Sequence, residues 1–552
     1  MSLRRAALSI VLTVFVCAGA VTAAGGRSSI TSSELKQWLT YIASDELEGR
    51  AVYSEGFGLA AGYIQMHLQE WGIEPRGDKD TYLQTVKVQG IRTTSRSSVT
   101  VQVGKDVRTF KDGEGITFPK FVGSKRTFTI DRVEFAAYGL DAPGEHYSDL
   151  AGHDFKGAAV IFVGNTPPAS IDAGSGRRLL YGRARWLTEQ MQAVAAIGPA
   201  PANPSRRQQD PSASRQPRPD FTTSERLDRQ VAPMLNANDA VLQFLFSRAP
   251  TKYDELKRKA DAGEPLTGFK LEGVTLTFTI DADYEVVRTQ LTQNIVAVIE
   301  GSDSQLRSSY VALGAHYDHV GYAETEVTSD SRRPAAPGRV TPGAENDRIW
   351  NGADDDGSGT VALMAIARAF AQGPRPKRSV LLVWHAGEER GLLGSHYYVD
   401  HPTVPLDRIV AQLNVDMIGR NRDNLPDEAN TVYVVGSDRI SSELHDVNRA
   451  ANRALDQPLT LDYDMNDPAD PEQLYFRSDH YSYAAKGIPV IFFTTGLHPD
   501  YHANTDDVSK IEFPKMTRVT QMIYETAWRL GNLDHPPVRD FKGPRAGKGT
   551  HE

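Results

Sequence analysis

Cysteine is almost absent from this chain. The 552 residues include one cysteine, Cys17, which lies in an apolar run close to the N-terminus. If that run is removed during export, no thiol is left, which excludes disulfide bonds, cysteine nucleophiles and zinc sites built on thiolates. Any metal ion would then be held by histidine, aspartate and glutamate side chains.

Long apolar runs and basic clusters are also lacking. Beyond the N-terminal run, no stretch reaches the roughly 20 apolar residues that a membrane-spanning helix needs. The formal net charge is -9 and no long basic run opposes it, which argues against a nucleic-acid partner. A hydrophobic content of 40% and a charged content of 24% are ordinary for a soluble globular protein.

The first 24 residues have the layout of a secretory signal peptide. Arg4 and Arg5 precede the apolar residues 6–21, and small residues follow as far as Ala24, near which we expect cleavage. This layout predicts a secreted or periplasmic protein with no membrane span after removal of the signal. The alternative is an uncleaved membrane anchor.

Length and composition divide the rest of the chain into two domains and a tail. Residues 25–110 and 266–540 are expected to form the main domain, and residues 541–552 a flexible tail. Residues 111–265 contain short strand-like runs broken by glycine and proline, which predicts an inserted β-rich domain. Within it, the region 199–220 is rich in Pro, Arg, Gln and Ser, so we expect a disordered surface loop there.

Strands and helices alternate from residue 294 onward. Strands are expected at residues 294–300, 310–315, 379–384, 409–415, 432–435 and 489–494, and helices at 359–371, 441–455 and 515–530. The alternation predicts an α/β fold, with a mainly parallel mixed sheet sandwiched by helices. In such sheets, ligands collect beyond the carboxyl ends of the strands.

Five separated stretches in the second half of the chain offer metal ligands, and four of them directly follow an expected strand. The side chains concerned are His316 with Asp318, Asp355 within the triple aspartate 354–356, the pair Glu388 and Glu389, Asp416, and His502. Two imidazoles and this number of carboxylates are enough to hold two zinc ions and leave a base beside them. The combination indicates a hydrolase.

Each stretch alone also has a purely structural explanation. A His-x-Asp pair can form a hydrogen-bonded turn, and residues 354–356 can cap the helix that follows them. A pair of glutamates is often surface decoration, although Glu388 and Glu389 point in different directions and can act separately as base and ligand. Asp416 is different, because it ends a very apolar strand where an unpaired carboxylate is costly.

Local chemistry leaves some assignments open. It does not separate Asp355 from its two neighbours, and His498 competes with His502 for the last position. Other histidines near the motifs are assigned to packing or supporting roles: His319, His385, His396 and His480.

In this order, the five stretches resemble the di-zinc aminopeptidase family of bacterial leucyl aminopeptidases and glutamate carboxypeptidase II. The resemblance extends to residues 43–50, to Ser478-Asp479-His480 and to the following Gly487-Ile488-Pro489. In the insertion, Tyr138-Gly139 and Phe155-Lys156-Gly157 resemble a protease-associated domain, which members of the family carry at this point.

The resemblance implies a role for each motif residue. It makes Asp355 the bridge between two zinc ions, one completed by His316 and Asp416 and the other by Glu389 and His502. It makes Glu388 the general base and Tyr501 the residue that stabilises the oxyanion. Asp318 would contact His316 and orient it for metal binding.

The implied protein is a secreted zinc exopeptidase that acts on peptides, most directly an aminopeptidase. A carboxypeptidase would instead need a basic pocket for the substrate carboxylate, to which Arg390, Arg420 and Arg477 could contribute. A third alternative is a receptor-like relative that kept the fold and lost catalysis. Manganese or cobalt would also suit these ligands, and the oligomeric state stays open.

Overall fold

The computed structural model describes residues 25–551 apart from 143–146, 172–178, 181, 201–219, 224, 330–335, 469, 471, 544–546 and 548. The expected signal peptide and most of the expected loop at 199–220 therefore lie outside the described residues. Of the expected tail, Thr550 accepts a hydrogen bond from the backbone of Tyr463, and His551 pairs with Asp462.

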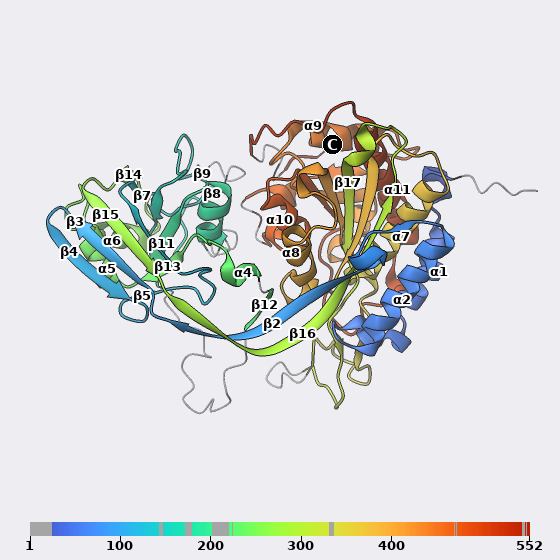
Figure 1. Cartoon of the computed structure of the whole chain (residues 1–552), viewed down its shortest axis with the longest axis horizontal. Helices are drawn as coiled ribbons and strands as arrows, with labels where there is room; N and C mark the ends of the chain where they lie inside the picture. Colours follow the sequence, from blue (N-terminus) through green and yellow to red (C-terminus); the bar gives the residue numbers. More distant parts are fainter. Residues whose placement is uncertain are drawn as a thin grey trace, which may run out of the picture.

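A ten-stranded mixed sheet forms the centre of the larger lobe (Figure 1). Its strand order is β12-β2-β16-β20-β17-β21-β24-β22-β23, and β1 pairs with β16 beside this row. The four central strands β20, β17, β21 and β24 are parallel. The strands are β1 (Glu74–Pro75), β2 (Leu83–Ser95), β12 (Asp220–Thr223), β16 (Ala282–Ile299), β17 (Tyr310–His316), β20 (Ser379–His385), β21 (Ile409–Val415), β22 (Thr431–Val435), β23 (Thr460–Asp462) and β24 (Val490–Thr494).

Helices cover both faces of this sheet, and each face has its own hydrophobic core. Successive residues of a strand therefore point into different cores. Ile295 and Ala297 of β16 join one hydrophobic cluster, whereas Val296 and Val298 join another on the opposite face. The first face is covered by α1 (Ser32–Ile42), α2 (Glu55–Glu70), α7 (Gly359–Ala371) and α11 (Phe513–Asn532), with α9 (Ser442–Arg453) against α11. The shorter α8 (Leu393–Asp400) and α10 (His480–Ala484) pack together on the second face. The predicted α/β fold with a mixed sheet between helices is confirmed. The sheet is not mainly parallel as expected, because β12, β2, β16 and β1 join it through antiparallel pairs and β22 pairs antiparallel with β24.

One strand is much longer than its apolar pattern indicates. β16 begins at Ala282, because its first half leaves the main sheet and continues as a ribbon with β2 (Figure 1). Residues 285–289 of this ribbon are exposed, so no buried face marks them as a strand in the sequence.

This ribbon leads to a smaller lobe with its own hydrophobic core (Figure 1). One sheet has the order β4-β3-β15-β6, formed by β3 (Ser98–Val103), β4 (Asp106–Lys111), β6 (Arg126–Ile130) and β15 (Val274–Ile280). The other has the order β14-β7-β10-β11-β13-β5, formed by β5 (Ile116–Thr117), β7 (Val133–Phe135), β10 (Ala159–Ile161), β11 (Ala195–Pro199), β13 (Met234–Ala237) and β14 (Phe269–Lys270), and it is accompanied by α5 (Asp239–Leu245) and α6 (Tyr253–Asp261). The lobe is thus wider than the expected insertion at 111–265, since β3, β4 and β15 share a sheet with β6. Its assignment as a protease-associated domain stays a prediction.

The smaller lobe contacts the larger one through aromatic and cationic side chains. Trp186 meets the ring of Phe476 edge-on at a centroid distance of 6.2 Å, and the Arg439 guanidinium lies 5.5 Å from the Trp186 ring. No helix among the described residues is long and apolar enough to cross a bilayer.

Candidate metal centre

The predicted ligands lie at one edge of the sheet. His316 ends β17, Glu388 and Glu389 follow β20, Asp416 follows β21, and His502 comes in the loop after β24. These four strands are parallel neighbours, so their carboxyl ends meet. Asp355 arrives from the turn that precedes α7.

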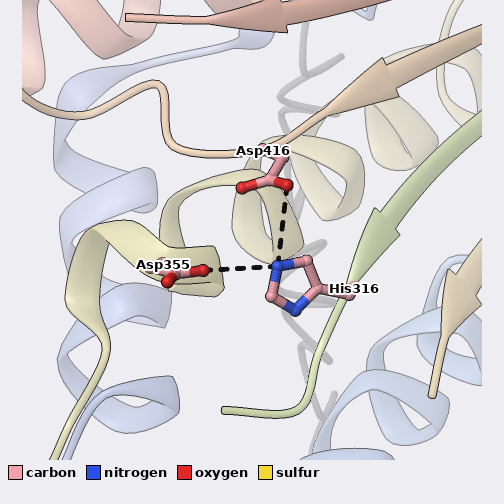
Figure 2. Close-up of side chains that lie close together, drawn as sticks. All are labelled: His316, Asp355 and Asp416. Carbon is pink, nitrogen blue, oxygen red and sulfur yellow. Dashed lines mark ion pairs between the residues drawn. The ribbon is translucent and has the colours of Figure 1, made fainter. Parts of the chain in front are cut away.

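Asp355 stands between two groups of side chains. Its Oδ1 lies 3.3 Å from His316 Nε2, which is also 3.7 Å from Asp416 Oδ2 (Figure 2). Its Oδ2 lies 3.0 Å from His502 Nε2, which in turn is 3.1 Å from Glu389 Oε2. The five predicted ligands therefore converge as two groups that share one carboxylate.

The structure separates the three adjacent aspartates by what their oxygens accept. Asp354 accepts the Gly419 N–H at 2.6 Å, and Asp356 accepts the Gly359 and Met417 N–H groups at 2.8 and 3.2 Å. Both carboxylates thus hold backbone in place, and Asp355 alone of the three reaches both His316 and His502. The peptide bond between Asp355 and Asp356 is cis.

Buried polar atoms without hydrogen bonds test whether these residues fit a metal. Among the described residues, His316 Nε2, Asp355 Oδ2 and Glu389 Oε1 are buried and have no hydrogen-bond partner. Leaving such atoms unpaired is costly. Imidazole nitrogen and carboxylate oxygen that converge in this way suit zinc, so the donor set fits two divalent ions on either side of Asp355.

A surrounding layer of hydrogen bonds fixes the ligands. The Ser478 hydroxyl donates to Asp416 Oδ2 at 2.6 Å, and the His316 Nδ1 lies 3.1 Å from the backbone carbonyl of Asp318. The Asp318 carboxylate is 3.8 Å from His316, and instead it accepts the N–H groups of Gly387 and Glu388. The support for His316 that we expected from the Asp318 carboxylate is therefore given by the Asp318 backbone carbonyl. The Asp318 carboxylate instead orients the turn that carries Glu388.

A pocket opens beside the ligands, and Glu388 and Tyr501 both line it. The remaining wall includes the apolar side chains of Met417, Leu474, Phe492 and Leu497, together with Arg477. The Arg477 guanidinium donates to the Tyr501 hydroxyl at 3.1 Å. The pocket thus joins predicted metal ligands, the Glu388 carboxylate, a phenol and an apolar surface.

Burial dominates the electrostatics of these groups. It raises the pKa of the Glu388 carboxyl well above its usual range, and the nearby Glu389 and Asp416 carboxylates raise it further. Burial also raises the pKa of the Tyr501 phenol, an effect that Asp355 adds to and Arg477 opposes. For Asp355 burial acts the same way, but the contacts with His316 and His502 outweigh it and hold the pKa well below its usual range.

The other histidines fall into distinct places. His498 Nε2 lies 3.2 Å from Asp354 Oδ2, so it is not the alternative to His502. His385 is buried against the Tyr483 hydroxyl at 3.0 Å, and His480 stacks on Phe492. His319, expected to play a packing or supporting role, lies 3.0 Å from Glu389 Oε1. The signal for it in the sequence was its position three residues after His316.

The three arginines considered for a substrate carboxylate differ. Arg420 is buried and pairs with Asp500 at 2.9 Å, so it is engaged away from the pocket. Arg390 is exposed, and Arg477 lines the pocket.

Comparison with known proteins finds a family that this part of the chain matches. Residues 294–527 match the sequence profile described as Peptidase family M28. The chain is 31% identical over 225 residues to a "probable leucine aminopeptidase 2" of Aspergillus oryzae, covering 40% of this chain and 37% of that protein. It is 27% identical over 278 residues to the aminopeptidase YwaD of Bacillus subtilis, covering 48% of this chain and 51% of that one. The chain thus spans about half the length of the curated relatives it matches, or less.

Solved structures were also matched. An aminopeptidase from Aneurinibacillus sp. strain AM-1 aligns over 94% of this chain and 99% of its own, with 16% identity and a TM-score of 0.43. A zinc aminopeptidase from Bacillus subtilis aligns over 93% of this chain and 98% of its own, with 16% identity and a TM-score of 0.42.

Proposed function

We propose that this protein is a zinc-dependent aminopeptidase that removes N-terminal residues from peptides, since residues 294–527 match the profile of Peptidase family M28. The observation that carries the proposal is the placement of Asp355 between two groups of ligands, at 3.3 Å from His316 and 3.0 Å from His502. His316 and Asp416 would hold one zinc ion, and Glu389 and His502 would hold the other.

The proposed reaction is hydrolysis of a peptide bond in the pocket beside these ligands. When bound, the two zinc ions would supply Lewis-acid chemistry, which polarises the scissile carbonyl and lowers the pKa of the attacking water. Glu388 takes the proton from that water and returns it to the leaving amine. Glu388 suits this role because it lines the same pocket as Asp355 and Asp416.

Tyr501 is proposed to stabilise the developing oxyanion. Its hydroxyl oxygen accepts a hydrogen bond from Arg477, so its own proton is free to be donated to the substrate. A donor held in place before the reaction stabilises charge in the transition state at little reorganisation cost.

The pocket also supports a substrate class. The free amine of a substrate would lie against the carboxylates around Asp355, and an apolar side chain would contact Met417, Leu474 and Phe492. Leucine is one such side chain, and several relatives are named leucine aminopeptidases. The layout of residues 1–24 supports secretion or export to the periplasm.

A panel of substrates tests the proposal. Leucyl-anilide and leucyl dipeptides should be cleaved, the same compounds with an acylated amine should not, and a chelator should abolish cleavage. Cleavage of the acylated compounds at the same rate would reject an aminopeptidase.

A carboxypeptidase is the second candidate, because Arg477 brings a guanidinium into the pocket. It would cleave acyl-blocked peptides that have a free carboxylate and would spare their amides. A receptor-like protein would cleave none of these compounds. Glu388 beside a complete set of ligands disfavours that alternative.

A further inference from the structure

His319 is a buried imidazole that lies beside two of the predicted ligands, Glu389 and Asp355. Its side chain is 0% exposed, and neither ring nitrogen has a hydrogen-bond partner among the described residues. Burying both polar atoms of a neutral imidazole without a partner is unfavourable. A second partnerless atom, Glu389 Oε1, lies 3.0 Å from His319 Nδ1.

The contact between these two atoms does not have the geometry of a hydrogen bond. At 3.0 Å an N–H aimed at a carboxylate would make a strong bond, yet both atoms remain without one. His316 Nε2 and Asp355 Oδ2 share this property, and each also lies within 4 Å of another ligand atom. Buried nitrogen and oxygen atoms that converge without hydrogen bonds suit a shared cation.

The backbone is built to bring the ring to this place. His319 N donates to the Arg50 carbonyl at 3.2 Å, which ties the segment after His316 to the N-terminal region. A Cβ atom at Gly352 would lie 2.5 Å from the His319 ring, so only glycine leaves room for it. His319 also meets the His502 ring edge-on at a centroid distance of 5.7 Å.

We propose that His319 Nδ1 is a further ligand of the metal held by Asp355, Glu389 and His502. His319 Nδ1 is 3.9 Å from Asp355 Oδ2, and together with Glu389 these residues offer ligand atoms within 4.8 Å of one another. This inference rests on the proposed two-metal function and extends it, since it makes the two positions unequal. One position has a single imidazole, His316, and the other has two, His319 and His502.

The inequality has a measurable consequence. Zinc accepts nitrogen ligands readily, so the position with two imidazoles should fill first and release its ion last. Removing His319 should reverse this order or make the two affinities similar.

X-ray absorption at the zinc edge of the two-zinc protein tests the ligand count directly. Three imidazoles over two ions give about 1.5 imidazoles per zinc, against about 1.0 if His319 is not a ligand. The count in the unaltered protein decides the question even if a variant folds poorly. A count of about 1.0 would overturn the inference.

Two variants supply a second readout that does not depend on activity. His319→Gln and His319→Ala should lower the count to about 1.0 and weaken the tighter zinc at least ~10–100-fold in a chelator competition. His480→Gln is the matched control, because it removes a buried histidine that stacks on Phe492. It should leave both readings unchanged.

The outcomes separate this inference from the function on which it rests. Two zinc ions with unaltered affinity in both His319 variants would reject His319 as a ligand and leave the aminopeptidase proposal standing. Fewer than two zinc ions in the unaltered protein would instead contradict the two-metal function itself.

Discussion

The Arg477 guanidinium donates a hydrogen bond to the Tyr501 hydroxyl oxygen across 3.1 Å. The Tyr501 ring also stacks on the His502 ring at a centroid distance of 4.1 Å. The phenol is therefore held on one side by a cation and on the other by a proposed metal ligand. The hydroxyl hydrogen of Tyr501 can still rotate to point at a substrate.

This relationship predicts coupled effects on turnover. Tyr501→Phe should lower kcat by about 10²–10³-fold, the usual loss for one oxyanion donor. Arg477→Ala should lower kcat by about 10-fold, equivalent to ~1.4 kcal/mol, because the phenol loses its support. In the double variant the two losses should not add. Steady-state kinetics with leucyl-anilide measures all three, and additive losses would mean that Arg477 does not act through Tyr501.

Glu388→Gln should separate catalysis from metal binding. The substitution keeps the shape of the side chain and removes its ability to take a proton, so kcat should fall by ~10²–10⁴-fold. Zinc content should not change, because Glu389 supplies the proposed ligand. Glu264→Gln in the smaller lobe, where the carboxylate is paired with Arg258 at the surface, is the control and should keep full activity. Normal turnover in Glu388→Gln would remove it from the mechanism.

Arg50 is predicted to hold the metal-binding turns together. It is 0% exposed and donates to the carbonyls of Ile42, Tyr317, Asn351 and Gly352 at 2.6–3.2 Å. Arg50→Met leaves these carbonyls unpaired and should lower the free energy of unfolding by about 3 kcal/mol or more.

Urea unfolding measures the Arg50 effect. Arg92→Met provides the comparison, since Arg92 forms an exposed pair with Glu285 and its loss should cost less than about 1 kcal/mol. Equal effects of the two substitutions would show that the contacts of Arg50 are not important for stability.

The raised pKa of Asp149 predicts that the stability of the smaller lobe depends on pH. Burial raises its pKa to about 6, although the Tyr147 hydroxyl and the Leu140 and Tyr138 N–H groups oppose this. A carboxyl whose pKa is raised on folding favours the folded state below its unfolded pKa of about 3.9 and loses that contribution as the pH rises through the folded value. Stability contributed by Asp149 should therefore fall between about pH 4 and pH 6.

Asp149→Asn removes this titration and keeps an acceptor for the two N–H groups. Thermal unfolding at pH 4.5 and pH 7 should show a smaller loss with rising pH in the variant than in the unaltered protein. An unchanged difference between the two pH values would exclude Asp149 as its source.

Much of the larger lobe could be predicted from the sequence, because its elements are strongly apolar. The bounds of α7 and β21 agree with the expected residues 359–371 and 409–415. The first half of β16 was not predictable, since most of its residues are exposed and give no alternating pattern of buried side chains. Pairing between strands distant in the sequence decides such segments.

The sequence predicted which residues form the site, but it did not predict what each of them contacts. The sequence identified the triple aspartate at 354–356, but only the N–H groups of Gly419 and Met417 show that Asp354 and Asp356 are engaged elsewhere. The proximity of His319 to Glu389 likewise depends on the space left by Gly352, which no local pattern reveals.

The zinc content of the purified protein tests the central claim most directly. After reconstitution and removal of free metal, elemental analysis should find two zinc ions per chain, and Asp355→Ala should lose both because it removes the shared carboxylate. Less than one zinc ion per chain in the unaltered protein, or full retention of zinc in Asp355→Ala, would contradict a centre bridged by Asp355.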